Sequence, residues 1–268
     1  MSWLSLINVE KFILFSLVLT RVSGLTMTAP IYGGKDIPMQ VRALLALALA
    51  LLITPTQWHV AIAYPGTMPM FLVYIATELL MGLCLGLGIV VLLSGIQLAG
   101  EMIGYTSGLM LAEALDPSIE TNVPLFSRLM SLVALAAFVC IGGHRLVMAG
   151  LLDTFASIPP GSGAVPISLG EAFVTLVAQS FHLAIRAAIP VVTSLLLATV
   201  VMGLISRTLP QLNVMAVGFS LNAMLGIGAL ALTLGAAVGA FQDQIAPALE
   251  TLLDALKSPL QTEWLRTS

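Results

Sequence analysis

Residues 43–53 read ALLALALALLI, a segment in which every position is apolar. A surface helix of a soluble protein keeps polar residues on the side opposite its core, and this segment has no such side. It belongs to a stretch of 35 residues without a formal charge, between Arg42 and Glu78, and a second stretch of 35 separates Arg207 from Asp243. A helix needs about 20 apolar residues to span a bilayer. The sequence therefore predicts an integral membrane protein.

The overall composition leads to the same class. Of the 268 residues, 59% are hydrophobic and 9% are charged, with a mean hydropathy of +1.05. A soluble domain is about 25% charged, so a soluble globular enzyme is excluded, and a disordered chain needs the opposite balance. The formal net charge is −3 and the basic residues are scattered singly. Nucleic-acid binding is excluded because no basic block is present to neutralise phosphates.

The pattern of the apolar segments predicts an all-α fold. Short alternating segments, the signature of a membrane β-barrel, are absent, and in a bilayer the remaining way to satisfy the backbone is a helix. We expect about six hydrophobic helices, some of them long, and a short additional one. The expected ranges are about 8–25, 40–53, 69–110, 124–142, 145–156, 169–206 and 214–240, followed by a charged tail at 243–268. The loop at 158–163 (IPPGSG) is the best candidate for an internal boundary.

Residues suited to enzyme chemistry do not occur in usable patterns. His59, His144 and His182 are isolated and lack the spacing of metal ligands. Cys84 and Cys140 lie in separate apolar runs and are interpreted as small hydrophobic residues. No nucleophile or nucleotide motif is present. We therefore expect a protein that is not an enzyme and that binds neither metal nor cofactor.

Polar residues on two of the expected helices recur every three or four positions, which places each set on one stripe. The stripes are Ser94, Gln97, Glu101, Gly104 or Tyr105, and Gly108 on one helix, and Thr175, Gln179, His182, Arg186, Pro190 and Thr193 on another. Ionisable groups within a membrane normally face a protein interior, a partner or water. We therefore expect a set of buried polar residues, namely Glu78, Gln179, His182 and Arg186.

Three roles remain open for these polar residues. One is structural ion pairing, for example of Arg186 with Glu78 or Glu101. Another is lining a conduit or a subunit interface, and the third is a proton relay. The spacings Gly82–Gly86 and Gly104–Gly108 permit close helix approach, either within the chain or against another subunit.

One segment carries a family resemblance. Residues 203–213 (GLISRTLPQLN), followed by Val217, Gly218 and Phe219, closely resemble the RxxPQLN…GF segment of the FliR family. The matching hairpin-turn residues are Arg207, Pro210, Gln211, Asn213, Gly218 and Phe219. Further matches occur in the family's order: Arg21 with Ala29-Pro30, Ile37-Pro38 with Arg42, residues 99–104 (AGEMIG), Asp116-Pro117, Gly142-Gly143-His144, Ile158-Pro159, and residues 183–190. The resemblance covers about residues 8–245. Ser220 and Cys140-Ile141 depart from the pattern usual in flagellar members.

The resemblance implies a core subunit of the flagellar type III protein export gate, located in the bacterial inner membrane at the flagellar basal body. FliR-like proteins form a channel with FliP and FliQ, FlhB docks on the complex, and unfolded flagellar subunits pass through. Helical hairpins stack into a ring in such assemblies. Within a single membrane domain, 1–268, residues 1–158 would be similar in plan to FliP and 164–268 to FliQ. The chain could also belong to the injectisome branch of the family, whose counterpart is SctT.

The resemblance also implies site residues. Residues 171–240 would form one hairpin that folds at 207–213, and 106–122 would be a plug that closes the channel, with Met110 and Leu111 as sealing residues. The channel or plug candidates are Gly100, Glu101, Gly104, Gly108, Met110, Leu111, Asp116 and Pro117.

Two other classes of function compete with this interpretation. A secondary transporter would use Glu101 or Arg186 at a midplane site, and such folds commonly carry inverted repeats, of which none is clear here. A passive scaffold for other membrane proteins is the second.

Overall fold

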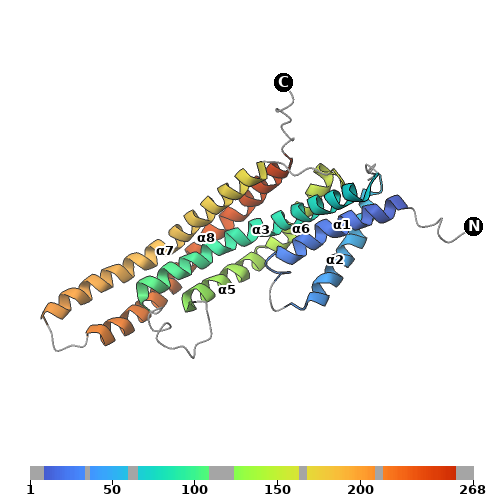
Figure 1. Cartoon of the computed structure of the whole chain (residues 1–268). Helices are drawn as coiled ribbons and strands as arrows, with labels where there is room; N and C mark the ends of the chain where they lie inside the picture. Colours follow the sequence, from blue (N-terminus) through green and yellow to red (C-terminus); the bar gives the residue numbers. More distant parts are fainter. Residues whose placement is uncertain are drawn as a thin grey trace, which may run out of the picture. The chain divides into compact units, whose positions relative to one another are not determined.

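The computed structural model describes residues 9–33, 37–59, 66–108, 124–162, 168–208 and 214–257. Every regular element within these ranges is a helix, and Figure 1 shows their order. The elements are α1 (Val9–Thr28), α2 (Met39–Ile53), the 3-10 helix η2 (Thr54–Gln57), α3 (Met68–Ser107), α5 (Leu125–Cys140), α6 (Gly143–Ser157), α7 (Ser168–Thr208) and α8 (Val214–Lys257). The all-α prediction is confirmed.

Five helices in the described ranges are long and apolar enough to cross a membrane. The number rises to six if the broken pair Leu125–Cys140 and Gly143–Ser157 counts as one span, which agrees with the expected six. The pair breaks at Gly142, whose φ of 76° lies in the left-handed region that favours glycine. The chain therefore has the helices of an integral membrane protein.

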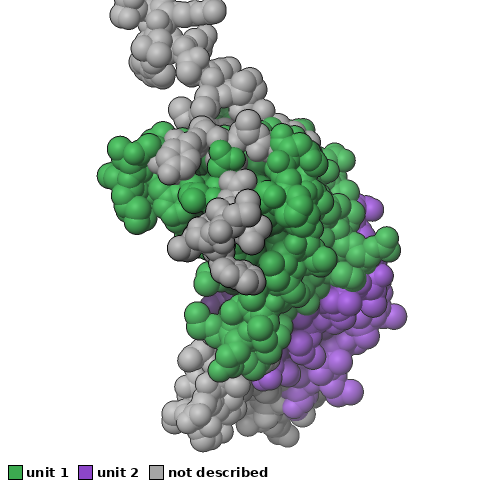
Figure 2. All heavy atoms as spheres, turned by 90° about the vertical axis from the view of Figure 1, so that its right-hand side faces the viewer, with its two compact units in different colours: residues 1–90, 142–176, 246–268 green, residues 91–141, 177–245 purple. Residues whose placement is uncertain are grey.

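The chain divides into two compact units, coloured separately in Figure 2. Unit 1 holds residues 1–90, 142–176 and 246–268, and unit 2 holds residues 91–141 and 177–245. The long helices α3, α7 and α8 each contribute residues to both units. This division differs from a boundary in the 158–163 loop, and the likeness of 1–158 to FliP and of 164–268 to FliQ stays a prediction.

The expected end of the last helix is wrong. We expected a helix of about 214–240 and a charged tail, but α8 continues to Lys257 and includes Pro247. Buried apolar residues recur every three or four positions through this part: Phe241, Ile245, Ala248, Leu249, Leu252 and Leu256. The charges Asp243, Glu250 and Asp254 are exposed. The helix continues because one side of it is buried, whereas the sequence interpretation gave weight to the charges on the other side.

Helices α7 and α8 run antiparallel as a helical hairpin (Figure 1). In unit 1, Ser168 Oγ donates a hydrogen bond to the carbonyl oxygen of Ala255 at 2.8 Å. In unit 2, Asn222 Nδ2 donates to Thr199 Oγ1 at 3.5 Å. In each pair the two residues are about equally far from Gln211 along the chain. Gln211 lies in the PQLN motif, where the sequence predicts the turn.

Candidate functional site

Three glycines bring the backbones of α1 and α3 into contact in unit 1. A Cβ atom added to Gly24 would lie 2.7 Å from the carbonyl oxygen of Leu79, and one added to Gly86 would lie 2.8 Å from the amide nitrogen of Ala29. A Cβ atom on Gly82 would collide with the carbonyl oxygen of Arg21. The Gly82–Gly86 spacing thus serves helix packing within the chain, one of the two alternatives it had left open.

At this close contact lies a buried ion pair between α1 and α3. The Nε atom of Arg21 donates a hydrogen bond to Oε2 of Glu78 at 2.6 Å. Both side chains are 0% exposed. A buried charge is tolerated when it is paired and hydrogen-bonded. Each of the two residues therefore supplies the opposite charge that allows the other to be buried.

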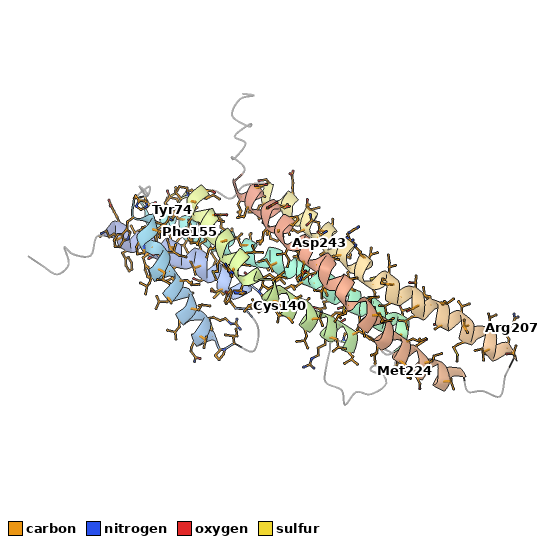
Figure 3. The ribbon with its side chains drawn as sticks, turned by 180° about the vertical axis from the view of Figure 1, so that it is seen from behind. Tyr74, Cys140, Phe155, Arg207, Met224 and Asp243 are labelled. Carbon is orange, nitrogen blue, oxygen red and sulfur yellow. The ribbon has the colours of Figure 1, made fainter. Side chains whose placement is uncertain are left out.

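The remaining donors of Arg21 are bound by α6 and the segment that follows it. Nη1 donates to Thr154 Oγ1 at 3.3 Å, and Nη2 donates to the carbonyl oxygen of Ile158 at 3.1 Å. The guanidinium carbon lies 4.3 Å from the centre of the Phe155 ring, a cation–π contact. Figure 3 labels Phe155 on α6 and the buried Tyr74 on α3. Arg21 therefore links α1 and α3 to the end of α6.

Glu78 binds the same segment through its second oxygen. The amide nitrogen of Gly161 donates to Oε1 of Glu78 at 2.9 Å. The φ of Gly161 is 83°, a conformation that favours glycine. We call Arg21, Glu78, Thr154, Phe155, Ile158 and Gly161 the Arg21–Glu78 cluster. It fixes three helices and the 158–161 segment, all within unit 1.

The partner of Glu78 differs from the pairing considered from the sequence. We had named Arg186 as a possible partner, but the structure pairs Glu78 with Arg21. Periodicity shows which residues share one helix face, and it does not show which helices meet. The available signal was Arg21 itself, a single charge inside the first apolar segment, together with Ile158-Pro159 among the matched motifs.

The polar stripe of α3 lies in unit 2. Gln97 Nε2 donates to Glu101 Oε1 at 3.4 Å, and Glu101 is half-buried. Gly100 and Gly104 are buried. A Cβ atom on Gly100 would lie 2.6 Å from the carbonyl oxygen of Phe126. Gly100 therefore serves the packing of α3 against α5, whereas Glu101 keeps part of its side chain accessible.

The expected plug lies almost wholly outside the described residues. Helix α3 ends at Ser107, and Gly108 follows with a φ of 77°. The candidates Met110, Leu111, Asp116 and Pro117 lie outside the described ranges. Their role stays a prediction.

The polar stripe of α7 is largely exposed in the part of the chain that the structure describes. His182 and Arg186 are exposed, and Gln179 is half-buried. Oε1 of Gln179 is enclosed but has no hydrogen-bond partner in the part of the chain that the structure describes. Burial of His182 and Arg186 would therefore require another molecule, and it stays a prediction.

The hairpin-turn residues are described in part. Arg207 is exposed at the C-terminal end of α7, as Figure 3 shows, and Gly218 is half-buried on α8. Pro210, Gln211, Asn213 and the side chain of Phe219 lie outside the described part of the structure. Among the residues the structure does describe, no three His, Cys, Asp or Glu side chains are grouped so that they could hold a metal ion.

Comparison with known proteins extends over nearly the whole chain. The family model for "Bacterial export proteins, family 1" matches residues 12–248. The flagellar biosynthetic protein FliR of Escherichia coli (strain K12) is 31% identical over 234 residues, which cover 85% of each chain. FliR of Aquifex aeolicus is 31% identical over 227 residues, or 84% of this chain and 87% of the relative. FliR of Bacillus subtilis is 30% identical over 221 residues, or 80% of this chain and 83% of the relative.

These matches and the membrane-length helices point to the same conclusion. The matched region includes the Arg21–Glu78 cluster, the polar stripes of α3 and α7, and nearly all of the α7–α8 hairpin. The chain belongs to the FliR family of bacterial export proteins, as a membrane-embedded transport component and not an enzyme.

Proposed function

We propose that this chain is a core subunit of the flagellar type III protein export gate. It forms the channel together with FliP-like and FliQ-like subunits, an FlhB-like subunit docks on the assembly, and unfolded flagellar subunits pass through. The family match over residues 12–248 supports this proposal, and the relatives compared above are flagellar biosynthetic proteins. The flagellar branch is therefore favoured over the injectisome branch.

The surface of α7 is the structural observation that carries the proposal. Only 22% of an apolar 18-residue stretch of α7 is buried within the described part of the chain. Large apolar side chains are exposed along it: Val174, Val177, Phe181, Ile185, Ile189, Leu196, Leu197, Val200 and Leu204. Such a surface is too apolar for water. The exposed His182 and Arg186 make it costly to place against lipid.

A second protein meets both requirements. Apolar side chains of a neighbouring helix can cover the valines and isoleucines, and its polar groups can bind the charged ones. This is the arrangement that stacking of helical hairpins in a gate ring requires.

We propose that the 106–122 segment closes the channel as a plug. Its first residues are described: α3 ends at Ser107, whose Oγ donates to the carbonyl oxygen of Gly104 at 2.9 Å, and Gly108 turns the chain. The chain thus leaves α3 shortly after Glu101, a half-buried residue of the polar stripe that we expect to face the channel.

The test of the proposed function is co-purification combined with export. The full chain, tagged, is purified from cells of a flagellated bacterium whose own FliR has been deleted, and the eluate is analysed by mass spectrometry. A gate subunit restores export of flagellar subunits and elutes with FliP-like and FliQ-like proteins. Elution as a single species, with no restoration of export, would instead fit a transporter and would overturn the proposal.

A further inference from the structure

Helix α7 carries a polar site near its middle, where Pro190 lies inside the helix. The helix is continuous from Ser168 to Thr208. Proline has no backbone N–H, so the carbonyl oxygen four residues earlier loses its usual donor. In α7 that carbonyl belongs to Arg186. The same residue therefore presents a cationic side chain and a backbone acceptor that has lost its donor in the helix.

This site lies on the outer side of α7 within unit 2. His182, Arg186 and Pro190 follow one another at intervals of four residues, which places them on one helix face. All three residues are exposed. On the opposite face, Ala184 and Ala188 are buried. The missing amide of Pro190 is therefore on the side of α7 that the described chain leaves open.

The described part of the chain does not complete the site. Arg186 has no carboxylate partner within the described ranges. A proline in a membrane helix is accommodated by a Ser or Thr hydroxyl, by water or by a neighbouring helix. The nearby Thr193 Oγ1 donates to the carbonyl oxygens of Ile189, at 2.5 Å, and of Pro190, at 3.1 Å. Its hydroxyl therefore serves other carbonyls than that of Arg186.

A carboxylate is the group that fits the Arg186 side chain best. The guanidinium is a planar fork of N–H donors, and a carboxylate accepts two of them in parallel. Exposed apolar side chains continue on both sides of Arg186, at Phe181 before it and at Leu196 after it. Arg186 is thus inside the apolar surface and not at its edge, where the phosphates of lipid headgroups lie. This position favours a carboxylate that a protein supplies.

The carbonyl oxygen of Arg186 needs a different group, namely a hydrogen-bond donor. An ionised carboxylate only accepts hydrogen bonds, so the group that binds the guanidinium cannot bind this oxygen as well. Helical side chains lean toward the N-terminal end of their helix, whereas backbone carbonyls point toward its C-terminal end. The two groups that bind Arg186 are therefore separated along α7. On a facing helix, about one turn of separation corresponds to three or four residues.

We propose that α7 binds a membrane helix of another gate subunit through this site. The partner helix carries an Asp or Glu opposite the Arg186 side chain. Three or four residues away it carries a Ser, Thr or Asn, which donates to the Arg186 carbonyl beside Pro190. This inference rests on the proposed function, which places protein against α7, and it adds the chemistry by which the partner is recognised.

Photo-crosslinking in the intact membrane identifies the partner helix. A photoreactive amino acid replaces Ile189, which is exposed beside Pro190, in the tagged full chain. The host is a flagellated bacterium whose own FliR has been deleted. We expect attachment to a membrane helix of a FliP-like or FliQ-like protein, with an Asp or Glu within about one turn of the attached residue. Attachment to lipid, to this chain itself or to a helix without such an acid would overturn the proposal.

Charge reversal then tests the pair directly. Arg186→Glu places two carboxylates together, and loss of one partner of a buried pair weakens association about 100-fold or more. We expect this variant to elute without the gate subunits, and to elute with them again when the crosslinked acid is changed to Arg. The matched control is Arg128→Glu on α5, also an exposed arginine, which should elute with the gate subunits.

The outcomes of charge reversal separate this proposal from the proposed function. If Arg186→Glu elutes with the gate subunits in normal yield, or if the reversed acid fails to restore the complex, the acidic partner is refuted. The proposed function stands in both cases. If the unsubstituted chain already elutes alone, the proposed function itself fails.

Pro190→Ala tests the backbone acceptor. Alanine supplies the N–H that binds the Arg186 carbonyl within α7, so the chain alone should unfold at the same or a higher temperature. The donor on the partner then loses its acceptor, and we expect association to weaken about fivefold or more. A stable chain with a weakened complex is a result that a purely structural role of Pro190 does not produce. Unchanged or stronger association would refute the second contact.

Discussion

Removal of Arg21 is the sharpest test of how the fold is held together. In an Arg21→Ala variant the buried Glu78 carboxylate loses its counter-ion and, among the described residues, keeps the amide of Gly161 as a donor. Removing one partner of a buried ion pair costs about 3–5 kcal/mol, because the other charge is left without compensation. Thr154 is affected less, since its hydroxyl already donates to the carbonyl oxygen of Leu151 at 2.6 Å. We therefore expect a loss of about 3–5 kcal/mol in the free energy of unfolding.

Two further variants separate the charge from the packing. Glu78→Gln keeps an oxygen for the amide of Gly161 but leaves the guanidinium of Arg21 without a counter-ion, so it should destabilise to a similar extent. The double variant Arg21→Met with Glu78→Leu removes both charges and fills the space. Apolar replacement of a buried pair is often neutral or stabilising, so this variant should be more stable than either single one.

The assay is denaturant unfolding of the full chain in detergent micelles, with Arg128→Ala as the matched control. Arg128 is exposed on α5, and substitutions at such positions usually change stability by less than about 0.5 kcal/mol. Limited proteolysis supplies a local measurement, because loss of the cluster should release the 158–161 segment. A loss of less than about 1 kcal/mol for Arg21→Ala, the range of an exposed pair, would refute the reasoning.

Three other outcomes follow from the same contacts. Gly82→Ala should lower the unfolding temperature because its Cβ would collide with the carbonyl oxygen of Arg21, whereas Gly170→Ala, with open space around it, should not; equal thermal shifts would contradict the helix contact. Arg186→Ala should reduce the yield of the co-purified complex before it affects the stability of the chain itself, and normal assembly with normal export would argue against a partner at this position. Deletion of residues 109–114 should keep assembly intact but raise the leak of ions across cell membranes, and unchanged permeability would indicate an ordinary loop.

Most helices could be predicted from the sequence because clusters of proline and glycine, such as residues 158–163, separate long apolar runs. The expected bounds of the first six helices lie within a few residues of those observed, including α7, which continues through Pro190. The expected end of the seventh helix, α8, was too early because its charged residues were interpreted as a tail. Burial of Ile245, Leu249 and Leu252 shows that tertiary packing extends this helix.

The Arg21–Glu78 cluster could be predicted only in part. A charge inside an apolar helix indicates that a partner exists, and the sequence therefore pointed to Glu78. Its partner, Arg21, is 57 residues away in the chain, and the choice between Arg21 and Arg186 depends on which helices pack together. Gly24, Gly82 and Gly86 decide that contact, because they let α1 and α3 approach at the level of the pair.

The positions of the charged residues in this chain determine which neighbours can cover its exposed apolar surfaces. Arg21 and Glu78 are satisfied inside unit 1, so this pair needs no charged partner from outside. His182 and Arg186 are exposed on α7 among apolar side chains, and neither water nor acyl chains suit both kinds of group. Past Arg42, α2 exposes leucine without any charge, which acyl chains suit well. The two surfaces therefore suit different neighbours, and we propose protein against α7.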